Sequence, residues 1–154
     1  MAETAALPAE ERVRELTADP KLTADDANRY ADLFLRAGKP AIALMFLERS
    51  KDEKRLRDVA TFAADAGDAF LLHGVNRIRP STVEAQQWRD AAGRARSAGK
   101  LLFARDCFEQ AGDAERAAEV HAEWLKIFET KSQETRDKIQ DVPPAPPGGN
   151  GATA

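Results

Sequence analysis

The sequence predicts an all-α fold of stacked antiparallel helical hairpins, followed by a disordered C-terminal tail. Apolar residues recur at helical steps of three and four along most of the 154 residues, and no segment alternates β-branched and aromatic residues as a strand would. Four of the periodic segments are followed at once by glycine, at Gly38, Gly67, Gly99 and Gly112. Glycine adopts the left-handed conformation that ends many helices without a Cβ clash, so each of these residues predicts a short turn between antiparallel helices.

The N-terminal part begins with one short helix and one hairpin. A helix is predicted over residues 8–16, because Pro8 suits the first helical position and two glutamates follow it in the first turn. The first hairpin is predicted over residues 24–49, with Thr23 as the N-cap of its first helix and Pro40 at the start of its second.

Two further hairpins are predicted over residues 53–79 and 81–111. The segment RPSTVE separates them. Pro80 ends the preceding helix, Ser81 is predicted to cap the next one, and Glu84 stands three residues later, where the acid of a capping box belongs. The third hairpin is therefore expected to begin at the serine.

The C-terminal part loses its apolar pattern in steps. A capping helix is predicted over residues 114–129, which completes a helical domain spanning 8–129. Residues 130–141 are mostly charged or polar and predict a solvated helical extension. Residues 142–154 are rich in proline and glycine and cannot bury a core, so they predict a disordered tail.

The hairpins repeat one pattern. Gly38, Gly67 and Gly99 are 29 and 32 residues apart, and an alanine lies seven residues before each of them. A small side chain at that position lets the two helices of a hairpin approach closely. One hairpin cannot bury its apolar face alone, so the repeat predicts a stack. The three alanines are Ala31, Ala60 and Ala92.

The third hairpin gives the pattern most fully: a bulky residue, a small one, a closing glycine, then a small and an aromatic residue. Its members are Trp88, Ala92, Gly99, Ala104, Phe108 and Ala111. This pattern resembles the tetratricopeptide-type repeat, which implies a right-handed superhelix of helical hairpins. The second hairpin departs from it at Leu72 and Asn76, and the spacing differs from the family's period of about 34 residues.

The resemblance also implies a binding groove. In tetratricopeptide-type modules the groove is lined by first-helix residues that directly follow the bulky core residues. Three arginines and an amide at such positions can hold a carboxylate or an acidic peptide through charge-assisted hydrogen bonds, although a solvated face is the alternative interpretation. We therefore expect a non-catalytic protein-interaction module, an adaptor or an assembly subunit. The residues carried over are Asn28, Asp32, Arg57, Thr61, Arg89 and Arg96.

Composition argues against nucleic acid and membrane surfaces as partners. The net charge is −3 and the isoelectric point is near 5.5, whereas general binders of these polyanions carry a basic excess. Two alternatives stay open: a nucleic-acid-binding helical repeat, and a small helical enzyme or ligand-binding domain with a site between hairpins. The first would use Arg57, Arg89, Arg94, Arg96 and Lys100.

No catalytic or metal-binding pattern is present in the sequence. A metal site needs at least three convergent ligands, and His73 and His121 have no second His or Cys three or four residues away. Cys107 has no histidine placed to activate it, so it is expected to be a structural residue. We therefore expect no enzyme activity, no metal and no cofactor.

The N-terminal segment predicts no export. It lacks a basic stretch followed by an apolar one, and no apolar run in the sequence reaches about 20 residues. A cytoplasmic protein without a membrane segment is therefore expected. The frequent Ala, Arg and Asp are typical of GC-rich bacterial genomes.

Overall fold

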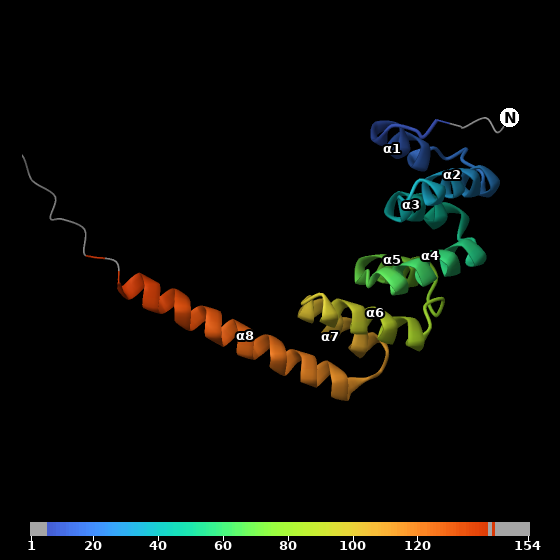
Figure 1. Cartoon of the computed structure of the whole chain (residues 1–154). Coiled ribbons are helices and arrows are strands. Elements are labelled where there is room, and N and C mark those ends of the chain that lie inside the picture. The colour runs from blue at the N-terminus through green and yellow to red at the C-terminus, as the bar shows by residue number, and fades with distance from the viewer. Residues whose placement is uncertain (1–5, 142, 144–154) are drawn as a thin grey trace, which may run out of the picture.

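The computed structural model describes residues 6–141 and residue 143, which form eight α-helices and no strand (Figure 1). The all-α prediction is confirmed for this part of the chain. The predicted tail, 142–154, lies outside the described residues except for Pro143. The helices are α1 (Glu10–Ala18), α2 (Ala24–Arg36), α3 (Pro40–Ser50), α4 (Glu53–Ala66), α5 (Ala69–Ile78), α6 (Ala85–Ser97), α7 (Leu101–Gln110) and α8 (Ala114–Gln140).

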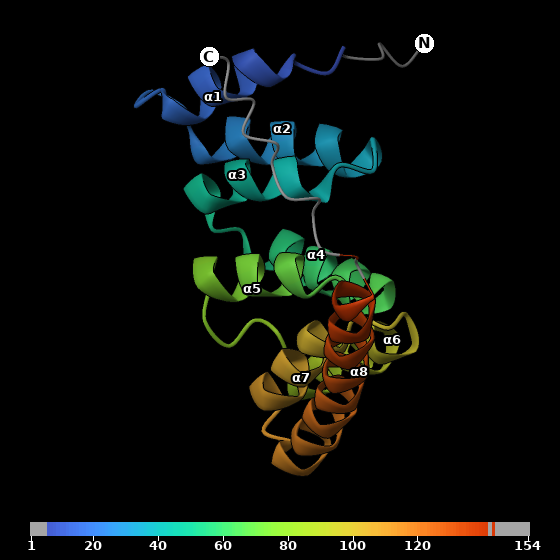
Figure 2. The same cartoon turned by 90° about the vertical axis from the view of Figure 1, so that its left-hand side faces the viewer.

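Consecutive helices pack in pairs, and the pairs lie one above another (Figure 1). The most extensive contacts join α2 to α3, α6 to α7 and α7 to α8, followed by those of α4 with α5 and with α6. The short helix α1 covers part of α3 at one end of the stack. At the other end α8 runs back along α7 and continues well beyond the stack in Figure 1; in the turned view of Figure 2 it projects toward the viewer, in front of the hairpins.

The four predicted glycine turns all have the left-handed conformation, with φ between +67° and +74°. The first shows the hydrogen bonds that all four share. The Lys39 N–H donates to the Phe34 carbonyl (2.9 Å) and the Gly38 N–H to the Leu35 carbonyl (3.1 Å), which is the Schellman pattern. These bonds satisfy carbonyls at the helix end and reverse the chain within a few residues.

Two glycines also permit close approach between hairpins. A Cβ at Gly67 would lie 2.9 Å from the Cβ of Arg94, so the end of α4 abuts α6. A Cβ at Gly74 would lie 2.8 Å from a terminal methyl of Leu44, so α5 abuts α3. The first contact is with a Cβ close to the backbone, and the second is with the far end of a flexible side chain.

Side chains cap the starts of four helices, and the predicted cap at Thr23 is confirmed. Thr23, Asp52, Asp68 and Asp113 each accept a hydrogen bond from the backbone N–H three residues ahead, at 2.9–3.2 Å. These caps fix the starts of α2, α4, α5 and α8.

The predicted cap at Ser81 is wrong. Ser81 has a left-handed φ of 68°, and α6 begins at Ala85 with Glu84 as its N-cap. The capping box is formed by Glu84 and Gln87. The reason is burial: Val83 is only 7 % exposed, so the chain first inserts this side chain into the core and starts the helix afterwards.

The first helix also starts later than predicted. It begins at Glu10 with Ala9 as N-cap, two residues beyond Pro8, and runs to Ala18. Only Val13 of this helix is buried, so little packing fixes its boundaries.

The core follows the predicted small residues. Ala31, Ala60 and Ala92 are fully buried. Around them lie the large buried side chains, among them Phe34, Phe46, Leu47, Leu56, Leu72 and Trp88.

Candidate protein-binding surfaces

The six residues of the predicted groove all lie on the first helices of the hairpins, and none is buried. Asn28, Arg57 and Arg89 occupy one position, five residues after the N-cap of their helix. Arg96 lies twelve residues after its N-cap, on the side of α6 that faces α8. The structure therefore brings three of the six into equivalent places and turns Arg96 away from them.

Asp32 is paired with a residue that the sequence analysis missed. Its two carboxylate oxygens each accept a hydrogen bond from Arg55, both at 2.8 Å. These bonds lower the pKa of Asp32 below its usual 3.8. Next to this pair, the Asn28 amide lies 3.5 Å from the Asp52 carboxylate. These four residues join α2 to α4. The Asp32 carboxylate is therefore already hydrogen-bonded within the chain.

Arg96 is paired with two glutamates of α8. It donates hydrogen bonds to Glu123, one of them at 3.3 Å, and lies 3.6 Å from Glu119. The guanidinium lowers the pKa of Glu123. Arg96 thus holds α8 against α6, and its charge is compensated inside the molecule.

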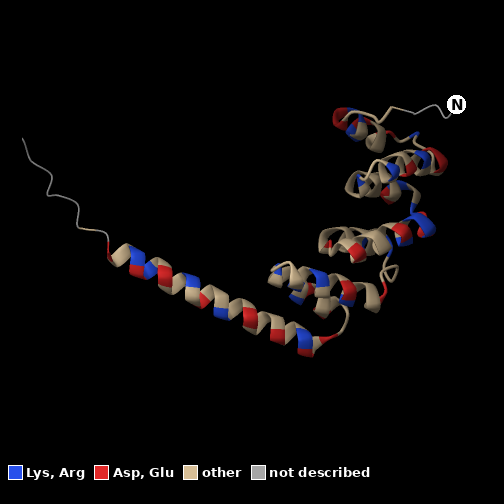
Figure 3. Ribbon diagram, in the orientation of Figure 1, with Lys and Arg blue, Asp and Glu red and all other residues tan. Residues whose placement is uncertain are grey.

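The remaining groove residues interact mainly within their own helices, except that the Thr61 hydroxyl also accepts a hydrogen bond from the Gln87 amide of α6 at 3.3 Å. Arg57 lies 2.6 Å from Glu53, and Arg89 donates to the Gln86 side chain at 3.3 Å. The Thr61 hydroxyl donates to the Arg57 carbonyl at 3.1 Å. Both signs of charge alternate over these helices in Figure 3. This face therefore carries isolated cations next to carboxylates, and whether it binds a peptide stays a prediction.

A second surface was not predicted from the sequence. Phe62, Phe70 and Phe103 are 52 %, 74 % and 55 % exposed, and they lie beside the glycine turns that close the hairpins. Phe62 and Phe70 line one hollow of about 510 Å³ together with the turn at residues 38–42. Phe70 and Phe103 line another of about 200 Å³ that includes the turn at residues 66–69. We call these three phenylalanines and the turns between them the turn edge.

The sequence contains a signal for the turn edge. Each phenylalanine lies within five residues of a closing glycine. An aromatic residue near a turn is a candidate for exposure, although Phe62 and Phe103 also lie three and four residues from the core residues Val59 and Cys107. Which residues of adjacent hairpins lie next to such an aromatic side chain depends on how the hairpins are placed on one another. The sequence does not specify that placement.

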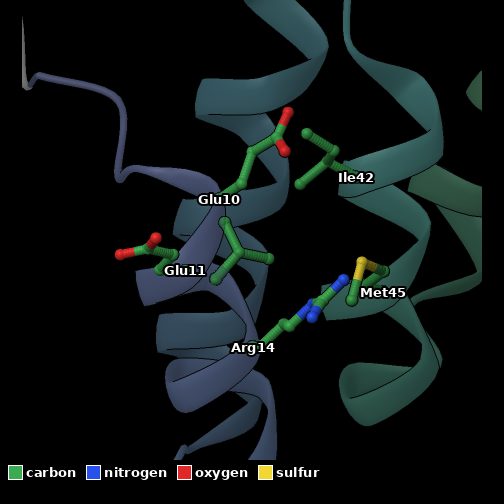
Figure 4. A pocket seen from close by; sticks show the side chains of 6 residues that line it. Glu10, Glu11, Arg14, Ile42 and Met45 are labelled. Atoms are coloured by element: carbon green, nitrogen blue, oxygen red, sulfur yellow. The ribbon is translucent and has the colours of Figure 1, made fainter.

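A further cavity of about 640 Å³ lies between α1 and α3 (Figure 4). Glu10 and Arg14 of α1 face Ile42 and Met45 of α3 across it, whereas Glu11 points away from α3. The cavity exists because the short helix α1 covers only part of α3 at the end of the stack.

The titratable side chains form one notable cluster. The His73 ring contacts the Asp106 carboxylate and packs at a tilt of 55° against the Trp88 ring, with centroids 4.9 Å apart. Cys107 next to them is fully buried, and burial together with Asp106 raises the pKa of its thiol to about 12. The thiol is therefore protonated at neutral pH. Over residues 6–141 no three potential metal ligands converge.

The comparisons with known proteins give no assignment: no family model, no curated protein and no solved structure matches the chain. The resemblance to tetratricopeptide-type repeats therefore stays a prediction based on the residues given above. Among the described helices, none combines the length and apolar character needed to cross a bilayer.

Proposed function

We propose that this chain is a non-catalytic protein-interaction module, an adaptor or assembly subunit, that contacts its partner through the turn edge. The observation that carries the proposal is the row of three exposed phenylalanines over adjoining hollows. Contiguous apolar surface is costly to leave in water and usually marks an interaction site. Aromatic side chains in shallow pockets contribute most of the binding energy in many interfaces.

The arginines of the first helices are a second region for the same partner. Arg57 and Arg89 are the members of the predicted groove that do not bridge two helices, so they are available to an acidic segment. Their neighbouring side-chain oxygens reduce the gain from such contacts, because a new partner must compete with existing ones. We therefore assign the larger share of binding to the phenylalanines.

The alternative of nucleic-acid binding receives less support. Arg94 and Arg96 lie 3.8 Å and 3.6 Å from Asp65 and Glu119, and Glu53 lies 2.6 Å from Arg57. Lysines and arginines bind phosphates by displacing the counterions of the nucleic acid, and the nearby carboxylates reduce that gain at these three arginines. We also propose a cytoplasmic location, as expected from the sequence.

The test compares three baits in a lysate of the source organism with quantitative mass spectrometry. The wild-type chain is compared with Phe62→Ser/Phe70→Ser/Phe103→Ser and with Arg57→Glu/Arg89→Glu, each checked for helicity by circular dichroism. We expect a protein that the wild type captures to be lost with the serine variant and retained, with at most a severalfold reduction, by the glutamate variant. Equal capture by the wild type and the serine variant would contradict the proposed surface.

A further inference from the structure

Helix α8 has the features of a first helix whose hairpin is missing. In α2, α4 and α6 the closing glycine follows the N-cap by 15 residues, as in Thr23 to Gly38. The same interval from Asp113, the N-cap of α8, ends at Phe128. Since phenylalanine replaces the glycine, the helix does not turn there and continues to Gln140.

The burial pattern of α8 supports this assignment. The residues seven, eight and eleven positions after the cap of α6 are Ala91, Ala92 and Ala95, and all three are buried. In α8 the residue at position seven, Val120, is buried, but His121 and Trp124 at positions eight and eleven are only half-buried. The face that a second helix would cover is therefore open.

The open face continues along the projecting part of α8. Leu125, Phe128 and Ile139 are 39 %, 56 % and 66 % exposed, and their spacing places them on one side of the helix. Ser132 and Thr135 lie between them on that side. The Thr135 hydroxyl donates to the carbonyl four residues earlier, at 2.9 Å, so its methyl group remains for packing.

We propose that this face binds the same face of a second copy of the chain, with the two α8 helices antiparallel. In heptad terms Leu125, Ser132 and Ile139 occupy a positions, and Phe128 and Thr135 occupy d positions. One antiparallel alignment places Phe128 against the partner's Ile139 and Ser132 against the partner's Thr135. Both contacts occur twice because the arrangement is two-fold symmetric.

The charges beside the seam select this alignment. On one flank Glu129 faces the partner's Arg136, and the pair recurs by symmetry. A shift by one heptad in either direction would place like charges opposite each other there. On the other flank Lys131 faces the partner's Lys138, and Glu134 lies one turn from both lysine positions on its own helix.

The shape of the molecule permits the antiparallel arrangement. From Leu125 to Gln140 every residue except Ser132 is exposed, and Figure 1 shows this part of α8 projecting away from the stack. Within this part of α8 the overlap covers residues 127–140, about 21 Å of helix, so the two stacks lie at its opposite ends. A parallel arrangement would bring the two stacks together and would place Lys131 opposite the partner's Arg136.

The first experiment measures the mass of the full chain by sedimentation equilibrium, from low to high micromolar protein. We expect the mass to rise from 16.8 kDa toward twice that value. Glu129→Arg and Arg136→Glu should each weaken the dimer about tenfold, and the double variant should restore it. Asp137→Arg, on the opposite side of the helix, is the matched control and should leave it unchanged. A monomer at every concentration, or equal weakening by the control, would overturn the proposal.

A second experiment tests the alignment directly. Equimolar Phe128→Cys and Ile139→Cys chains are mixed under mild oxidation, and we expect a disulfide-linked dimer because the two positions face each other. The native Cys107 does not interfere since it is fully buried. Asp137→Cys in place of Ile139→Cys should give no such product. Equal cross-linking of the control would overturn the proposed contact. Neither experiment depends on the turn edge, so the proposed function can fail independently.

Discussion

The two junctions between successive hairpins are built from different interactions. Between the first and second hairpins, two ion pairs join the helices: Asp32 with Arg55, and Glu48 with Arg77 at 2.7 Å. Between the second and third hairpins, the backbone at Gly67 lies directly against α6, beside a longer Arg94–Asp65 pair at 3.8 Å and the His73–Asp106 contact. The helix contacts are also more extensive at this second junction. We therefore expect the first junction to depend mainly on its ion pairs and the second mainly on close packing.

The largest expected effect is that of Gly67→Val on the second junction. The substitution combines a left-handed φ of 67° with a Cβ 2.9 Å from Arg94, so strain and overpacking add. We expect the free energy of unfolding to fall by about 3–5 kcal/mol, measured by urea denaturation. Gly99→Val is the control, because its φ is 74° but nothing lies near its Cβ; we expect a loss of about 1–3 kcal/mol. Equal losses in the two variants would contradict close packing at the second junction.

The next effect concerns the ion pair of the first junction. Arg55→Met removes two hydrogen bonds from Asp32, whose side chain is 35 % exposed. We expect a loss of about 1–2 kcal/mol in the free energy of unfolding, reduced from the value of a buried pair by solvent. Arg57→Met, which removes an exposed pair within one helix, should cost about 0.5 kcal/mol or less. If both variants lost the same amount, the first junction would not depend on its ion pair.

The same pair predicts a pH dependence. The pKa of Asp32 is lower in the folded state than its usual 3.8, because the Arg55 hydrogen bonds favour the carboxylate. Its stabilisation is therefore fully present above about pH 4 and is lost as the pH falls through the lower folded value. The difference in unfolding free energy between wild type and Arg55→Met should shrink below pH 3.8. A constant difference from pH 6 down to about pH 2 would argue against stabilisation of the Asp32 carboxylate by Arg55.

The smallest effect is a change in the rate at which a thiol reagent labels Cys107, not a change in stability. Cys107 is fully buried and its thiol has a pKa of about 12, so a thiol reagent should react with it only when α7 opens. We expect slow labelling of the wild type and of Arg55→Met, and faster labelling of Gly67→Val. Faster labelling of Arg55→Met alone would mean that the two junctions are coupled.

Local chemistry made part of the fold predictable. The glycine turns and the Thr23 cap were found from the sequence because a left-handed φ and an N-cap each depend on a few neighbouring residues. Ser81 was assigned wrongly because the burial of Val83, a tertiary effect, decides where α6 begins.

The surfaces were less predictable, because the contacts that define them depend on how the hairpins pack together. Asp32 and Arg55 are 23 positions apart, and only the offset of neighbouring hairpins brings them together. The exposure of Phe70 is likewise decided by what the adjacent hairpin leaves uncovered. The residue types predicted a charged face on the first helices, but the ion-pair partners of those charges could be identified only from the structure.

The sparse first junction has a mechanical consequence. Since few backbone contacts hold the first hairpin to the second, small rotations about this joint change the curvature of the whole chain at little cost. Tension applied at the two ends should separate α2 and α3 from α4 before any helix unwinds. We therefore expect the distance between the two ends of the chain to change while the second and third hairpins keep their arrangement.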